Sequence, residues 1–414
     1  MYRVLNLFIP GFEALKKTIF ILLCLTILTL PNLEAPKNIF FLSFLIGWIF
    51  YAFKYDKSGG NWIGLDTIFL IWILLDFIVA ANAFFNHSQP IKGMFDILRF
   101  VSFGWIISRI DFKDSQIKII VTLVAVSIIP IFYNLYNCNF DRCIELNSVG
   151  HVNHTAIYIL LVISFLASYL TSIIGLSLKR IIATTLILLL IFALSIVIIM
   201  SLSRAATGVL AVIYFAFLSY GFFKLSYKVK LLITAFIILV GSFLIQEPPS
   251  VFNKFKQAEE FFSEKNHRQR IRNFSYELAR LDPILGVGMG SFPNYKLSDI
   301  KQNVIKEKGL EWWINNSEGV YSEYAHPHNL YYHYLVGGGV TFLFIMISYW
   351  VYVLMKVKSQ IYKGKFDWTG LSALNVAFII LAIGIVNTTL ESENAMLSFL
   401  ILGIFFSRLR FNEY

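Results

Sequence analysis

The feature that most constrains this chain is a series of apolar runs, each about 20 residues long. A helix of that length crosses roughly 30 Å of hydrocarbon, so each run predicts a membrane-spanning helix. Only 14% of the residues are charged, whereas a water-soluble domain carries roughly a quarter. We predict an all-α polytopic membrane protein with about twelve transmembrane helices, near 14–33, 38–54, 64–85, 91–110, 117–135, 153–174, 179–201, 204–223, 230–246, 328–356, 367–388 and 393–410.

Basic residues set the predicted orientation, because Lys and Arg gather in cytoplasmic loops. With the N-terminus in the cytoplasm, the inside segments hold nineteen basic residues and the short outside loops hold only Lys37, Lys92, Arg142 and Arg204. Both termini are therefore predicted to be cytoplasmic. The net charge of +10 falls in short clusters between apolar runs, so no nucleic-acid partner is expected.

One large hydrophilic segment interrupts the series late in the chain. The predicted division is transmembrane helices one to nine over 1–246, a large extracytoplasmic loop over 247–327, and transmembrane helices ten to twelve over 328–414. The loop is expected to begin with short amphipathic helices at the membrane interface, because aromatic and charged residues alternate up to Glu264.

A further helix is predicted in this loop over 267–281. Its apolar face consists of Ile271, Phe274, Leu278 and Leu281. A glycine-rich stretch over 286–290 then turns the chain. In an earlier outside loop, Cys138 and Cys143 are close enough in sequence to form a disulfide in an oxidising compartment.

Two arginines lie where a charge is costly. Arg99 falls inside the fourth predicted span and needs a partner or a polar cavity. Arg204 lies between the seventh and eighth spans, where it either reaches lipid phosphate or holds a bound anion. The small residues around Arg204 favour a site, since they let a ligand approach closely.

Histidines open two of the predicted spans. His326-Pro327-His328-Asn329 precedes the tenth, where a neutral imidazole could accept a proton from a hydroxyl or simply make an interfacial hydrogen bond. No metal is expected, because His328 and His333 are five residues apart and off a common helix face.

His151-Val152-Asn153-His154 opens the sixth span. Asn153 could cap that helix, or Asn153 and His154 could face a cavity.

Together these motifs resemble the O-antigen ligase and O-antigen polymerase superfamily. The resemblance rests on twelve spans with one large late loop, an Arg opening the eighth span, an Arg-bearing helix before Pro283-Ile284-Leu285-Gly286-Val287-Gly288, and His328-Asn329 followed by glycines about ten residues later. It is strongest over about 200–345.

The resemblance implies a GT-C-like fold in the bacterial inner membrane, with a periplasmic active site and no metal or cofactor. It implies that His328 is the catalytic base and that Arg204 and a loop arginine bind the donor diphosphate. Arg268 has the family's separation from Pro283, whereas Arg270 has the aromatic Phe274 four residues on, so both are candidates. Further candidates for the cavity are His326, Asn329, Asn153 and His154.

The implied reaction is that of an O-antigen ligase. It would transfer a glycan from undecaprenyl diphosphate to lipid A core oligosaccharide by an inverting mechanism without metal. The alternatives are an O-antigen polymerase with the same donor, a protein O-oligosaccharyltransferase, and a polytopic transporter, for which Arg99 would suit a substrate path. The His328-Asn329 motif favours the ligase, and the lack of repeated halves disfavours the transporter.

Overall fold

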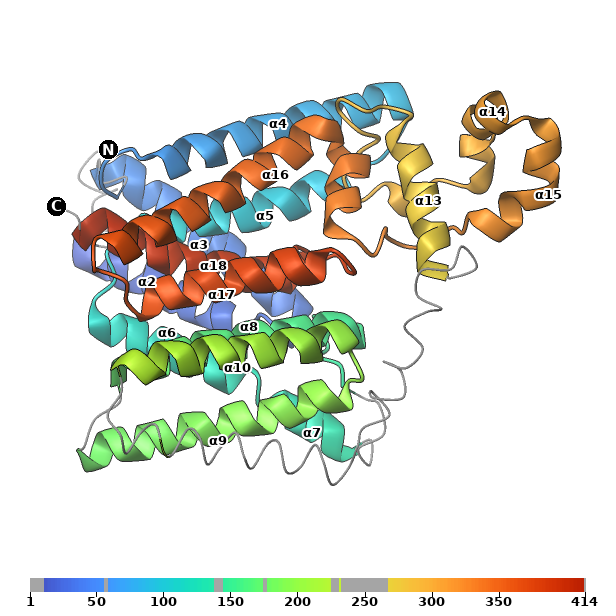
Figure 1. Ribbon diagram of the computed structural model, residues 1–414. Coiled ribbons are helices and arrows are strands. Elements are labelled where there is room, and N and C mark those ends of the chain that lie inside the picture. Colours follow the sequence, from blue (N-terminus) through green and yellow to red (C-terminus); the bar gives the residue numbers. More distant parts are fainter. Residues whose placement is uncertain are drawn as a thin grey trace.

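The protein is an all-helical bundle with a small group of helices projecting from one end (Figure 1). Over the part of the chain that the structure describes, every named element is a helix, and Leu146 and Gly150 form an isolated β-bridge. The predicted all-α polytopic class is confirmed. The computed structural model describes residues 11–55, 59–137, 144–173, 177–224, 231 and 267–412.

The predicted spans coincide with helices wherever they fall on described residues. Among those residues, seven helices are long and apolar enough to cross a membrane. The ninth predicted span lies outside the described residues apart from position 231, as do the 247–264 segment, Cys138 and Cys143. The bundle helices are α2 Phe12–Thr29, α3 Glu34–Tyr55, α4 Gly64–His87, α5 Lys92–Ile107, α6 Asp114–Ser127, α7 Pro130–Asn137, α8 Val152–Ile173, α9 Leu178–Met200, α10 Arg204–Lys224, α16 Leu330–Tyr362, α17 Trp368–Gly384 and α18 Ser392–Asn412.

The span predicted over 117–135 falls within one candidate membrane span, Asp114–Asn137, which consists of α6 followed by α7, because Pro130 has no N–H to continue the first helix and instead starts the second. One predicted boundary was wrong. The eleventh span was predicted to reach residue 388, but α17 ends at Gly384. The polar residues that follow α17 form a connection and leave side chains available for other contacts.

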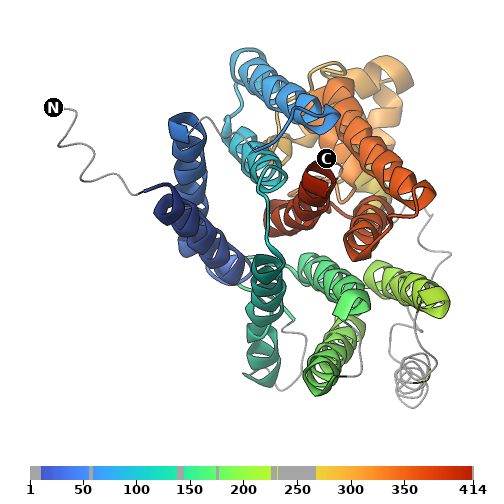
Figure 2. The same cartoon turned by 90° about the vertical axis from the view of Figure 1, so that its left-hand side faces the viewer.

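Helices α8 and α18 form the centre of the bundle. In the most apolar 18-residue stretch of each of these two helices, 83% of the residues are buried, whereas only 11% of the residues in the corresponding stretch of α3 are buried. Figure 2, seen along the helices, shows α18 enclosed by its neighbours. Aromatic rings fill this centre, and Tyr349 of α16 stacks on Phe399 of α18 at a centroid distance of 5.1 Å. These two helices are thus held by packing against their neighbours.

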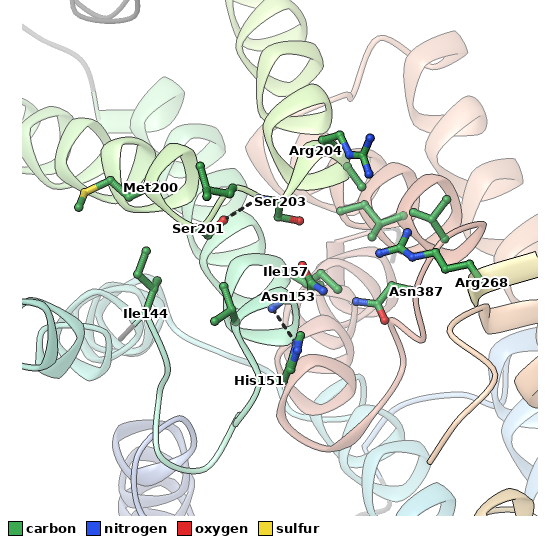
Figure 3. Close-up of a pocket in the computed structure, with 15 residues that line it drawn as sticks. Ile144, His151, Asn153, Ile157, Met200, Ser201, Ser203, Arg204, Arg268 and Asn387 are labelled. Carbon is green, nitrogen blue, oxygen red and sulfur yellow. Dashed lines mark hydrogen bonds between the residues drawn. The ribbon is translucent and has the colours of Figure 1, made fainter. Parts of the chain in front are cut away.

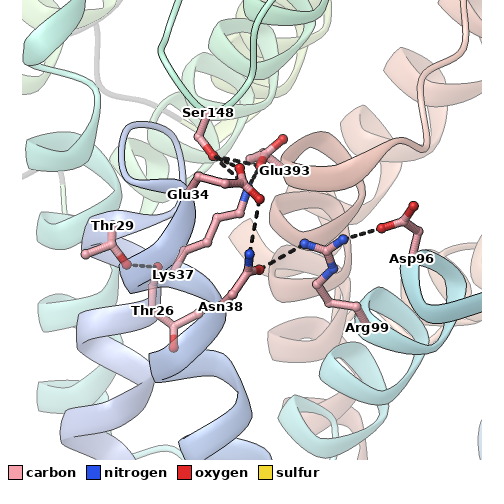
Figure 4. A network of polar contacts seen from close by, with 9 residues as sticks. All are labelled: Thr26, Thr29, Glu34, Lys37, Asn38, Asp96, Arg99, Ser148 and Glu393. Atoms are coloured by element: carbon pink, nitrogen blue, oxygen red, sulfur yellow. Dashed lines mark hydrogen bonds and ion pairs between the residues drawn. The ribbon is translucent and has the colours of Figure 1, made fainter. Parts of the chain in front are cut away.

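A polar network surrounds Arg99, as its position inside a span required. Arg99 is paired with Asp96 and donates to Asn38 at 3.1 Å. Asn38 donates in turn to Glu34 at 3.1 Å, and Lys37, which is 1% exposed, is paired with Glu34 and Glu393 (Figure 4). These pairs join the starts of α3, α5 and α18, and each buried charge has an opposite charge beside it.

Three helices form the projecting group: α13 His267–Ala279, α14 Leu297–Lys308 and α15 Leu310–Val320. The predicted apolar face of α13 is buried, with Ile271, Phe274 and Leu278 all at 0% exposure in a core that this group forms together with Val336 of α16. This burial fixes the rotation of α13 about its own axis. It thereby decides where the polar residues in its first turn point.

Glycines dock this group onto α16. The amide of Val287 donates to Val336 O and that of Gly288 to Gly337 O, both at 2.9 Å, and Val340 N donates to Pro283 O at 2.9 Å. A Cβ on Gly286 would lie 2.5 Å from the backbone nitrogen of Gly338, so side chains would prevent this approach. The glycines of the 286–290 stretch and of α16 are therefore direct contact partners, and they place α13 relative to the start of α16.

Candidate functional site

A cavity of about 420 Å³ lies where four separate parts of the chain meet. Its walls come from the start of α8, the turn between α9 and α10, the start of α13, and the end of α17 with the residues that follow it (Figure 3). The side chains with polar groups that line it are His151, Asn153, Ser201, Ser203, Arg204, Arg268 and Asn387.

Arg204 is the first residue of α10 and lies at one edge of this cavity. The turn before it is tight: Leu202 has a left-handed φ of 56°, and the amide of Ser203 donates to Ser201 Oγ at 3.3 Å. The turn directs Arg204 to the cavity from a helix N-terminus, where backbone amides also attract anions.

Arg268 reaches the same cavity from the first turn of α13. Burial, followed by the positive charges of Arg204 and Arg272, lowers the pKa of Arg268. The two cavity arginines therefore act on each other electrostatically although 64 positions separate them in the sequence. An anion between them would offset this repulsion.

Arg270, the other candidate on this helix, does not line the cavity. Its Nε is buried and has no hydrogen-bond partner among the described residues. The rotation of α13 thus presents Arg268 to the cavity and directs Arg270 elsewhere.

His328 lies next to the cavity. Its side chain is close enough to Asn387, a cavity residue, for Asn387 to affect its pKa, and its ring centroid lies 4.0 Å from that of His326. The backbone of His328 is left-handed, with φ 49°, which turns the chain just before α16 begins. Burial, then the charges of His326 and Arg268, lowers the pKa of His328 to about 3. The imidazole is therefore neutral near pH 7 and can accept a proton.

Other titratable side chains lie near His328. The ring of His326 lies 5.7 Å from that of His154, and His154 Nδ1 lies 3.7 Å from Glu391 Oε2. Nδ1 of His326 is buried without a hydrogen-bond partner among the described residues. Neither His326 nor His154 lines the 420 Å³ cavity.

The two asparagines of the histidine motifs are placed differently. Asn329 is the N-cap of α16: its Oδ1 accepts from Tyr332 N at 3.0 Å and its Nδ2 donates to Ile385 O at 2.7 Å. Asn153 was considered as a cap for α8, but there His151 Nδ1 accepts from Asn153 N at 3.2 Å, so His151 is the residue that supplies a side-chain acceptor. Asn153 lines the cavity.

Asn387 and Glu391 are the site residues that the sequence motifs did not indicate. Both lie between α17 and α18, in the polar run Asn387-Thr388-Thr389-Leu390-Glu391. A short polar run between two apolar spans is the signal that could have identified them. The first two residues of this run were predicted to belong to the eleventh span, so the run was not recognised as a connection between two helices.

The site combines two guanidinium groups with a neutral imidazole. Guanidinium forks match the oxygens of a diphosphate, and a neutral imidazole can remove a proton from a hydroxyl. Within the described residues, His, Cys, Asp and Glu side chains form no group of three that could hold a metal ion.

Comparison with known proteins identifies one family. Residues 186–347 match the family model described as O-Antigen ligase. A search of curated proteins finds no match. The matched segment contains Arg204, Arg268, His328 and the docking glycines of α16, whereas Asn387 and Glu391 lie beyond it. The family resemblance inferred from the motifs is confirmed.

Proposed function

We propose that this chain, a polytopic membrane protein carrying an O-antigen ligase domain, transfers a glycan from undecaprenyl diphosphate to lipid A core oligosaccharide on the periplasmic face of the bacterial inner membrane. The observation that supports this most is the cavity shared by Arg204 and Arg268, with a neutral His328 beside it. The arrangement supplies one group for each requirement of an inverting transfer: a place for the leaving diphosphate and a base for the acceptor.

The donor diphosphate would lie between the two arginines. Many glycosyl transferases neutralise this leaving group with a divalent cation, but two guanidinium groups can provide the same charge through paired hydrogen bonds. Ser203 and the α10 N-terminus add donors on the same side of the cavity. The polyprenyl chain would extend into the membrane.

His328 would act on the acceptor. The acceptor hydroxyl oxygen attacks the anomeric carbon while the bond from that carbon to the diphosphate oxygen breaks, and the electron pair leaves with the diphosphate. The hydroxyl proton passes to the imidazole. Attack from the face opposite the leaving group inverts the anomeric configuration, and one base is enough for this path.

Donor binding would also prepare the base. The charge of Arg268 is one cause of the low pKa of His328. A diphosphate anion on Arg268 offsets that charge and raises the pKa toward the ordinary value, because it stabilises the imidazolium form. His328 would therefore become a stronger base once the donor is in place.

The acceptor distinguishes the ligase from its nearest alternative, a polymerase that adds a second lipid-linked repeat. Purified protein is given a labelled lipid-diphosphate glycan together with lipid A core or a second lipid-linked repeat, without any ion gradient. We expect the label to become covalently attached to lipid A core. Attachment only to the second repeat would indicate a polymerase, and movement of unmodified donor across a vesicle membrane would indicate a transporter.

A further inference from the structure

A second cavity, of about 960 Å³, lies between α6, α8 and α9, away from the candidate site. Figure 2 shows these three helices as neighbours, in teal and green. Its apolar walls include Ile117, Val121 and Ala125 of α6 and Ala183, Ile187 and Leu190 of α9. These positions recur every three or four residues, so each helix turns one continuous face to the cavity.

The length of this groove matches one leaflet of a bilayer. Its lining runs from Asp114 to Val126 on α6 and from Lys179 to Leu190 on α9, which is about 18 Å and about 16 Å at the rise of an α-helix. One leaflet of hydrocarbon is roughly 15 Å thick, half of the usual core. Leu186 and Ile129, which are 61% and 52% exposed, leave the side of the groove open to lipid.

One end of the groove is positively charged. Lys118, Lys179 and Arg180 lie there, all exposed, and none has a carboxylate partner among the described residues. A fourth cation, Arg408, differs because it is paired with Asp114 at 2.8 Å and Asp367 at 3.5 Å. Both α6 and α9 begin at this end, so their backbone amides add to the attraction for an anion.

We propose that this groove binds one anionic glycerophospholipid. Its phosphate lies on Lys118, Lys179 and Arg180, and its acyl chains lie along the apolar faces of α6 and α9. The apolar walls require chains and the basic end requires a negative headgroup, so neither a soluble phosphate nor an uncharged lipid satisfies both. This end carries the basic residues that predict the cytoplasmic side, so the lipid would belong to the leaflet opposite the proposed active site.

Native mass spectrometry of the full chain in non-ionic detergent tests the headgroup contact. The protein is titrated with phosphatidylglycerol and with phosphatidylcholine of the same acyl chains. We expect one phosphatidylglycerol to be retained about tenfold or more tightly than phosphatidylcholine, since basic residues near a membrane surface each add to anionic lipid binding. The variant K118Q/K179Q/R180Q should lose this preference. The control K54Q/K356Q/K358Q removes the same charge from other helix ends and should keep it.

A second variant tests the apolar wall. Ala183→Trp places a large side chain in the groove without changing charge, and it should lower retention of the bound phosphatidylglycerol. If the triple variant does not fold, Ala183→Trp still tests whether the groove binds the lipid. Equal retention of the two lipids by the wild type, or full preference in both K118Q/K179Q/R180Q and Ala183→Trp, would show that the groove holds only exchangeable bulk lipid and would overturn the proposal.

Discussion

At the level of single residues, His328 is the proposed general base. We expect His328→Ala to lower turnover roughly a hundredfold or more, the usual scale for loss of a positioned base, while donor affinity is retained because the arginines remain. His326→Ala, which removes the neighbouring ring, should have a milder effect. Turnover and donor affinity are measured on the same folded preparations. Reduced affinity with unchanged saturated turnover would make His328 a binding residue instead.

The arginines make a second prediction at this scale. Arg204→Ala and Arg268→Ala should each impair donor binding severely, and Arg204→Lys should recover little because an ammonium group does not reproduce the guanidinium fork. Arg270→Ala is the matched control, since Arg270 is on the same helix but does not line the cavity. Donor affinities at equal protein levels give the comparison. If donor affinity falls more in Arg270→Ala than in Arg268→Ala, Arg270 and not Arg268 contacts the donor.

The charge state of His328 is directly measurable. Its pKa is lowered to about 3 by burial and by His326 and Arg268, so the neutral imidazole should persist as the pH falls and be lost only near that value. In NMR spectra of protein labelled with ¹⁵N-histidine, the signal of His328 is the one that is missing from the His328→Gln variant. This signal should stay in its neutral form from pH 8 to pH 5, because even pH 5 is about two units above the pKa expected for His328. Protonation near the ordinary pKa of 6.5 would contradict the effect of burial and Arg268.

At the level of elements, the glycine contact between the projecting helices and α16 holds α13, and with it Arg268, in place. Gly339 has φ 66° and a Cβ there would lie 2.2 Å from Ile284 O. We expect Gly339→Ala to cost about 2–4 kcal/mol, the sum of a left-handed backbone penalty and a clash in a close-packed contact. Transfer activity should fall as well, because α13 and Arg268 are positioned through this contact. Thermal unfolding and transfer assays measure the two effects.

Gly364→Ala separates the two contributions. Gly364 has a similar φ of 65°, but a Cβ there would meet nothing within 4 Å. It should therefore show only the backbone penalty of about 1–2 kcal/mol and keep full transfer activity. Equal losses of activity in the two variants would mean that the docking contact does not position the site.

At the level of the whole molecule, the proposed reaction needs no divalent metal. Two arginines provide the positive charge for the leaving group, so transfer should continue in excess chelator. The measurement compares initial rates in the purified system with chelator, magnesium and manganese. Loss of transfer in chelator that either metal restores would replace the arginine-based mechanism by a metal-based one.

The architecture follows largely from local sequence pattern. The length of each apolar run predicted the helices of the bundle, because a membrane span depends on consecutive residues. The buried face of α13 was likewise predictable from the spacing of Ile271, Phe274 and Leu278. Even the need of Arg99 for a partner could be inferred from its place inside a span, although Asp96 and Asn38 could not be named in advance.

The composition of the site depended instead on how distant segments pack. Sequence pattern left both Arg268 and Arg270 as candidates, because which of them meets the cavity depends on where α13 is placed when Gly286 and Gly288 dock onto the glycines of α16. It also gave no indication that Asn387 would lie beside His328, since α16 and α17 separate the two residues and no local periodicity relates them. Helix formation depends on neighbours in the sequence, whereas the cavity exists only where separately specified helices pack together.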